Sequence, residues 1–146
     1  MGLGAALLRR RRVRQEEGRQ RDEALAILDA VGLAARRDEA AGGLSYGDQR
    51  RVEVAIGLAA RPRLLLLDEP ASGMTASEKV ELGALIGRIR AGGTGVFLVE
   101  HDMRVVMGIS DRILVLHHGR LIADGPPEAV RRDAEVVRAY LGAPPE

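Results

Sequence analysis

The sequence has 146 residues, enough for one domain with a buried core, and 46% of them are hydrophobic while only 2% are aromatic. The net charge of +1, from 22 basic and 21 acidic residues, gives no sign of nucleic acid or an anionic membrane as a partner. The absence of cysteine excludes disulfides, thiol catalysis and thiolate metal sites, and no apolar stretch is long enough for direct membrane insertion.

The first part of the chain predicts two amphipathic helices with a loop between them. Apolar residues follow helical spacing over Gln20–Val31, and Gly32 is typical of a helix C-terminus. After a loop rich in alanine and glycine, Ser45 and Gly47 stand at the start of a second helix, which ends before Pro62. The N-terminus of a helix favours an anion through its unsatisfied N–H groups and its dipole, although Ser45 alone would be an ordinary N-cap in most proteins.

The run Leu64–Leu67, followed directly by Asp68 and Glu69, is the most informative segment. An unbroken aliphatic run predicts a parallel strand that is covered on both faces. Ligands of open α/β sheets bind beyond the carboxyl ends of the strands, so these two acids indicate a site for Mg²⁺ and phosphates. Asp68 would stand on the metal side, and Glu69 would orient or deprotonate a water. An acidic turn without chemistry explains the run alone equally well.

The next segment predicts a helix and a second buried strand. Thr75 and Glu78 make a capping-box pattern that opens a helix extending to Ile89. A glycine-rich turn leads to the strand Val96–Val99, and His101 follows two residues after it. A lone histidine at a strand end is usually structural, but this one follows a strand that can lie beside the first.

The remaining elements complete an α/β pattern. A short helix precedes a third strand, Ile113–Leu116, and His118-Gly119 is a turn signal that predicts a hairpin. Pro126-Pro127 and two short helices ending near Tyr140 finish the chain. Strands that alternate with helices predict a parallel sheet with right-handed crossovers.

In this order, the motifs resemble those of the ATP-binding subunits of ABC transporters. Ser45–Gln49 resembles the signature sequence, and Leu64–Glu69 resembles the Walker B strand with its catalytic glutamate. Ser72–Thr75 resembles the D-loop, and His101 resembles the switch histidine. The resemblance implies a P-loop NTPase-like parallel sheet flanked by helices, with part of the helical subdomain at the N-terminus. It covers almost the whole chain, from about Leu7 to Gly142.

Further segments are similar to the subunits that energise uptake of branched-chain amino acids. These segments are Leu44–Gly47, Glu100–Met103, Val106–Arg112 and Ala139–Gly142. The resemblance implies ATP and Mg²⁺ as cofactors, with a second ABC ATPase subunit and transmembrane permease subunits as partners and no nucleic acid. It also implies a cytoplasmic location, peripheral at the inner membrane through the permease.

The resemblance assigns roles to individual residues. Glu69 and His101 would be catalytic, and Asp68 would hold Mg²⁺ through water. The signature residues would bind nucleotide; they are Ser45, Tyr46, Gly47, Asp48 and Gln49. The D-loop residues are Ser72, Gly73 and Met74.

The chain departs from the family pattern in two respects. Asp48 stands where glutamine is usual, and its charge would repel an approaching γ-phosphate even though it suits the helix dipole. No Gly-x-x-x-x-Gly-Lys-[Ser/Thr] loop occurs anywhere in the sequence. We therefore expect a truncated ABC ATPase domain that is inactive alone, with residues 1–61 as partial helical subdomain and signature helix and residues 62–146 as the C-terminal part of the ATPase core.

Two other interpretations remain beside this one. The chain would alternatively be a non-catalytic fragment or a binding module that docks on a permease or a partner ATPase. The C-terminal half of a chromosome-maintenance ATPase also carries signature and Walker B motifs without Walker A. That class needs a long heptad coiled coil upstream, which the short stretch before Gln20 does not provide.

Overall fold

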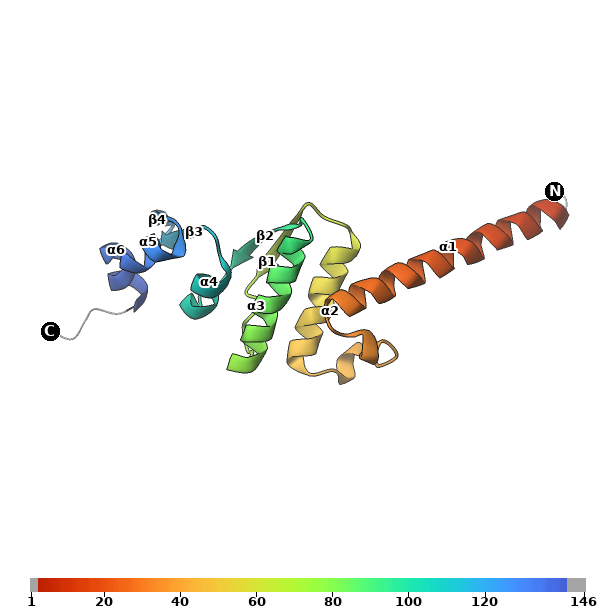
Figure 1. Ribbon diagram of the computed structural model, residues 1–146, viewed down its shortest axis with the longest axis horizontal. Helices are drawn as coiled ribbons and strands as arrows, with labels where there is room; N and C mark the ends of the chain where they lie inside the picture. Colours follow the sequence, from red (N-terminus) through yellow and green to blue (C-terminus); the bar gives the residue numbers. More distant parts are fainter. Residues whose placement is uncertain (1–2, 142–146) are drawn as a thin grey trace. The chain divides into compact units, whose positions relative to one another are not determined.

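The computed structural model describes residues 3–141, with side chains for residues 12–140, so Gly142 of the C-terminal motif lies outside the described residues (Figure 1). The chain divides into two compact units, Met1–Leu98 and Val99–Glu146. Within the described residues, no helix is both long enough and apolar enough to cross a membrane.

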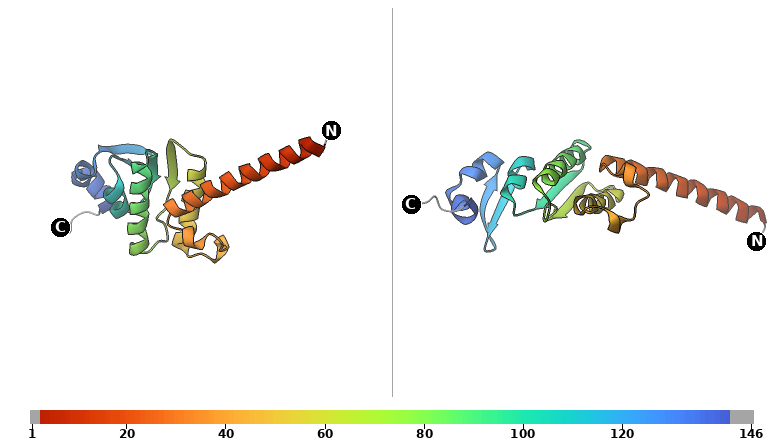
Figure 2. Two further views of the ribbon diagram at one scale, coloured as in Figure 1. Left: turned by 45° about the vertical axis from the view of Figure 1, so that its right-hand side comes forward. Right: turned by 90° about the horizontal axis from the view of Figure 1, so that it is seen from below.

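The first unit contains three α-helices, two short 3₁₀ helices and two strands (Figures 1 and 2). In chain order these are α1 (Leu3–Ala30), η1 (Ala34–Arg36), η2 (Ala41–Gly43), α2 (Tyr46–Ala59), β1 (Leu64–Asp68), α3 (Ala76–Ala91) and β2 (Gly95–Val99). The predicted helices and strands are all present. Helix α1 begins at Leu3, well before the predicted start at Gln20.

Gly32 ends α1 in the way that the sequence predicts. Its φ of +78° lies in the left-handed region, where glycine carries no steric penalty. The backbone N–H of Gly32 donates to the Asp29 carbonyl at 2.9 Å, and that of Leu33 donates to the Leu28 carbonyl at 2.7 Å. This is the Schellman arrangement, which satisfies two carbonyls at the end of the helix and brings Leu33 into the core.

The core of the first unit is aliphatic, as expected from a chain with so few aromatic residues. It joins the C-terminal end of α1 to α2, β1 and α3 through a cluster of buried side chains, namely Val31, Leu33, Val54, Ala55, Leu65, Leu85 and Ile89. Because β1 contributes Leu65 to this cluster, the position of the carboxyl end of the strand depends on helix packing.

Strands β1 and β2 are joined by α3 and form a small parallel sheet, which confirms the predicted pairing. The N-terminal ends of the two strands lie side by side, because the Gly95 backbone N–H donates to the Arg63 carbonyl at 2.9 Å. The expectation that both faces of β1 are covered is wrong: Leu65 is buried, but Leu64 and Leu66 are 56% and 68% exposed. Side chains alternate between the faces of a strand, and within the described residues the helices pack only on the face that holds Leu65.

The second unit is built around a hairpin. Helix α4 (Met103–Ile109) precedes the antiparallel strands β3 (Ile113–His117) and β4 (Arg120–Gly125), and α5 (Pro127–Arg132), α6 (Ala134–Val136) and η3 (Val137–Leu141), a short π-helix, follow. His118 and Gly119 both have positive φ, +47° and +76°, as a two-residue type I′ turn requires. The predicted hairpin is thus confirmed. The core of the second unit is formed by Ile113, Val115, Val130 and Val136.

Candidate functional site

The N-terminus of α2 is built by Ser45. Its hydroxyl accepts a hydrogen bond from the Asp48 backbone N–H at 3.2 Å, and its carbonyl accepts one from the Gln49 N–H at 2.9 Å. The Gln49 side chain donates to the Leu44 carbonyl at 3.1 Å, which fixes the chain entering the helix. Ser45 is therefore a true N-cap, as its residue type predicts, and Gly47 is buried in the first turn.

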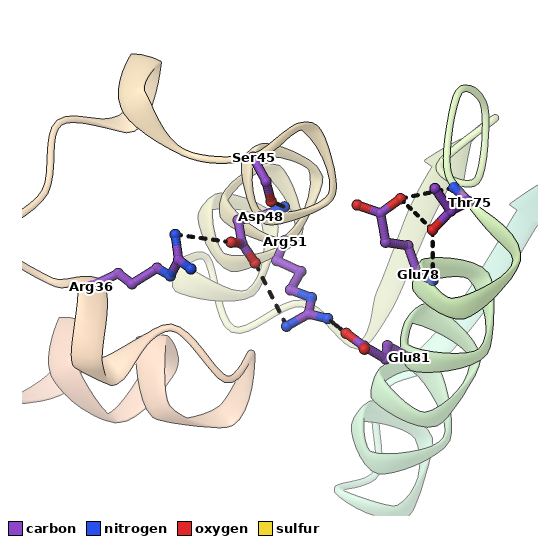
Figure 3. Close-up of polar contacts among 7 residues, drawn as sticks. All are labelled: Arg36, Ser45, Asp48, Arg51, Thr75, Glu78 and Glu81. Atoms are coloured by element: carbon purple, nitrogen blue, oxygen red, sulfur yellow. Dashed lines mark hydrogen bonds and ion pairs between the residues drawn. The ribbon is translucent and has the colours of Figure 1, made fainter.

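Asp48 lies between two arginines (Figure 3). Its carboxylate is 3.4 Å from Arg36 Nη1 and 3.7 Å from Arg51 Nη1, and only 15% of its side chain is exposed. These two cations offset the negative charge at the position where the family usually has glutamine. The repulsion of a phosphate expected from the sequence is correspondingly reduced by partners that lie outside the motif.

The turn before α3 contacts the same end of α2. Gly73 has a φ of +72°, and a Cβ there would be 3.1 Å from the Tyr46 ring. The Tyr46 hydroxyl in turn accepts hydrogen bonds from the Arg50 guanidinium, the shorter at 2.6 Å. Met74 is buried beneath the turn. The structure thus brings the predicted D-loop residues against the predicted signature residues of the same unit.

Asp68 is the last residue of β1, and the exposed Glu69 follows it. Glu69 has a φ of +45°, a left-handed conformation that is uncommon for residues with a Cβ and costs about 1–2 kcal/mol. Its carbonyl accepts the Ser72 N–H at 3.1 Å, so the turn holds this conformation. Strain of this kind gathers at functional sites, which supports a role for Glu69.

A magnesium ion fits the acids at this strand end only as a partner of phosphate. The part of the chain that the structure describes has no cluster of three acidic, histidine or cysteine side chains able to hold a metal. Mg²⁺ is commonly bound through one or two carboxylates together with water and substrate phosphates. Asp68 can supply one such carboxylate by itself.

His101 lies in the second unit, just after β2 and before α4. It is exposed, and its backbone N–H donates to the Glu100 carboxylate at 3.2 Å. Asp102 caps α4 by accepting the Arg104 N–H at 3.0 Å. The role of His101 beside Asp68 and Glu69 remains a prediction.

Comparison with known proteins decides the family. The family model described as "ABC transporter" matches residues 4–72, which include the Ser45 cap and Asp68-Glu69. A second model, "Branched-chain amino acid ATP-binding cassette transporter", matches residues 120–145. These two matches identify the chain as part of an ABC transporter ATP-binding domain.

Individual ABC proteins are similar along nearly all of this chain. The high-affinity branched-chain amino acid transport ATP-binding protein LivG of Escherichia coli is 43% identical over 142 residues, which are 97% of this chain and 56% of that protein. BraF of Pseudomonas aeruginosa, of the same description, is 42% identical and covers 94% and 54%. The chain therefore spans about half the length of these relatives.

A solved ABC structure matches the fold. The ADP conformation of MJ1267, an ATP-binding cassette of an ABC transporter, aligns with a TM-score of 0.79 at 27% identity and covers 86% of this chain and 51% of that one. The α/β architecture predicted from the motifs is confirmed as part of an ABC ATPase fold.

Sequence reasoning missed one residue of this region. Glu78 was expected only as the partner of Thr75 in a capping box, which the structure confirms. One of its carboxylate oxygens also lies against Gly47, so close that a Cβ at Gly47 would be 2.6 Å away. The capping-box pattern gives no sign of this contact, because the two residues belong to different helices.

Proposed function

We propose that this chain is part of an ATP-binding and ATP-hydrolysing subunit that energises import of branched-chain amino acids. The observation that carries the proposal is the 43% identity to a branched-chain amino acid transport ATP-binding protein across 97% of the chain. The second family model supports the same cargo through its match to residues 120–145. We further propose a second ATPase subunit and permease subunits as partners, and a position at the cytoplasmic face of the membrane through that permease.

The chemistry proposed for the end of β1 is hydrolysis of the γ-phosphoryl bond. Mg²⁺, when bound, neutralises the charge that develops on the phosphates, and Asp68 would hold it, through water. Glu69 would accept a proton from the attacking water while the bond from the γ-phosphorus to the bridging oxygen breaks, leaving ADP and phosphate. His101 would donate a hydrogen bond to the γ-phosphate and stabilise its charge.

The chemistry proposed for α2 is nucleotide binding on behalf of a partner. The Ser45 hydroxyl, Gly47 and the N–H groups of the first turn would face phosphates that another subunit holds, with Tyr46, Asp48 and Gln49 beside them. The helix dipole and the Arg36 and Arg51 side chains near Asp48 make this end of α2 acceptable to an anion. Ser72, Gly73 and Met74 would serve as the D-loop beside it.

Uptake of labelled leucine tests this proposal. Deletion of the gene is expected to lower leucine uptake, and the parent sequence, but not Glu69→Gln, is expected to restore it. Glu128→Gln is the matched control, because that exposed carboxylate forms ion pairs with Arg131 and Arg132 of its own helix, α5. Leucine, isoleucine and valine uptake that is unchanged by the deletion would refute the proposed cargo.

A specific observation favours a second candidate, a non-catalytic module that docks on a permease or a partner ATPase. The 146 residues contain no phosphate-binding loop with its lysine, and Lys79 on α3 is the only lysine. In this alternative Glu69→Gln would restore leucine uptake as well as the parent does. The same experiment therefore separates the two candidates.

A further inference from the structure

Glu78 lies between two segments to which the family resemblance gives separate roles. One carboxylate oxygen, Oε2, accepts hydrogen bonds from both the backbone N–H and the hydroxyl of Thr75, each at 2.8 Å. Thr75 Oγ1 accepts the Glu78 N–H at 3.3 Å, which completes the capping box of α3. Figure 3 shows the other oxygen directed toward the N-terminus of α2.

That other oxygen, Oε1, lies against Gly47 in the first turn of α2. A Cβ at Gly47 would approach it to 2.6 Å, and would be 3.0 Å from the carboxyl carbon. Real Cβ atoms do not come so close, so this contact requires glycine. Gly47 is buried, whereas Gly87 in α3 has open space around it.

The Glu78 carboxylate lies beside the first turn of α2. The first N–H groups of an α-helix have no intrahelical acceptor, and together with the dipole they attract a negative charge. Ser45 accepts the Asp48 N–H, and Glu78 Oε1 lies against Gly47 in the same turn. Glu78 thus places an internal anion where an external one would bind.

The charges around Glu78 favour its ionised form. Hydrogen bonds from the Thr75 backbone and side chain lower the pKa of Glu78 below its ordinary value of 4.5, and the Gly47 backbone and the Arg51 charge act in the same direction. Asp48 and Tyr46 on α2 and Glu81 on α3 are the other titratable groups nearby, and Arg51 forms ion pairs with both acids. A carboxyl group with a lowered pKa stabilises the fold at neutral pH, and this contribution is lost as the pH falls through the folded-state pKa.

We propose that Glu78 is a positioning residue whose carboxylate couples the N-terminus of α2 to the turn 72–75, and that any phosphate binding at this end of α2 must first displace it. The inference rests on the function proposed above, because it concerns the same end of α2. Displacement of Glu78 from Gly47 would also loosen its bonds to Thr75. Phosphate binding at α2 would in this way affect the predicted D-loop of the same chain.

Amide NMR of the full chain tests the coupling without any ligand. In the parent, the Gly47 and Thr75 amide signals are expected to move with one common midpoint below pH 4.5. Glu78→Gln keeps a side chain that suits a capping box, so α3 remains capped, but the shared titration should disappear. Separate midpoints, or a Gly47 shift of equal size in Glu78→Gln, would overturn the coupling.

Titration with inorganic phosphate at neutral pH tests the displacement. Half-saturation of the Gly47 shift is expected at a phosphate concentration roughly two- to fivefold lower in Glu78→Gln, the range that a charge at a helix terminus provides. Glu128→Gln, which removes an exposed carboxylate paired with Arg131 and Arg132 on α5, should behave as the parent does. Equal half-saturation in parent and Glu78→Gln would refute displacement. If the pH titration succeeds and phosphate moves no signal in either protein, the coupling stands and the displacement is refuted, while the leucine uptake assay still decides the proposed function.

Discussion

Glu69 combines a chemical expectation with an unusual backbone conformation. The sequence places it directly after an aliphatic strand and an aspartate, and the structure gives it a φ of +45° in a turn closed by Ser72. A residue in that conformation is retained against a steric cost, and the Ser72 N–H bond to its carbonyl holds the backbone there.

In the assembled transporter, Glu69→Gln is expected to leave ATP binding intact while turnover falls by about 10²- to 10⁴-fold, the usual loss when a general base is removed. The amide keeps the shape of the carboxylate but accepts no proton. Single-turnover hydrolysis beside nucleotide affinity measures both effects, with Glu128→Gln as the control. Turnover within a few-fold of the parent would show that Glu69 is not the base.

Local caps were predictable at the residue scale, whereas contacts between helices were not. Ser45, Gly32 and the Thr75–Glu78 capping box act within a few residues of their own position, and each has the predicted hydrogen bonds. The approach of Glu78 to Gly47 depends on how α3 packs beside α2. Spacing along the chain carries no information about that packing.

At the scale of elements, two glycines in helices have opposite surroundings. A Cβ at Gly57 in α2 would lie 2.7 Å from Cδ1 of Leu65, which is buried in β1. A Cβ at Gly87 in α3 would meet nothing within 4 Å. Close contact between α2 and β1 therefore requires glycine at position 57, whereas the surroundings of α3 do not require glycine at position 87.

Gly87→Ala is expected to raise the free energy of unfolding by about 0.5–1 kcal/mol, because alanine loses less conformational freedom in a helix. Gly57→Ala carries the same gain but overpacks the core, which typically costs about 1–3 kcal/mol. Urea denaturation of both variants measures the difference. Equal stability changes would show that Leu65 does not hold α2 at this distance.

The whole molecule exposes apolar surface on its parallel sheet. Leu64, Leu66 and Phe97 are each more than half exposed, and strand alternation places them on the face opposite Leu65 and Val96. The sequence predicted the strands correctly but predicted cover for both faces. Which face of the sheet is covered depends on the helices that pack on it, and an aliphatic run does not specify them. Within the described residues, β1 pairs with β2 alone.

This surface is expected to make the chain associate, since exposed apolar faces and free strand edges favour intermolecular contacts. Leu66→Lys combined with Phe97→Lys should shift the chain toward monomer in sedimentation velocity. The matched control is Val80→Lys, an exposed apolar residue on α3 that lies outside the sheet. A parent that is already a monodisperse monomer would contradict the expectation.

The nucleotide affinity of the chain itself follows from the groups that it offers to phosphate. ABC and other P-loop ATPases hold the β- and γ-phosphates with a backbone loop and its lysine, and the 146 residues contain no such sequence. Asp68 offers one carboxylate for Mg²⁺, and the α2 N-terminus already holds the Glu78 carboxylate. Isothermal calorimetry with Mg²⁺ and ATP should therefore give a dissociation constant of about 1 mM or weaker, a binding free energy of about −4 kcal/mol.

Residual binding should fall further in Asp68→Asn and remain unchanged in Asp22→Asn, which alters an exposed acid on α1. A micromolar constant in the parent would mean that other residues of this chain replace the phosphate loop, and the assignment of α2 to a partner's nucleotide would then be wrong.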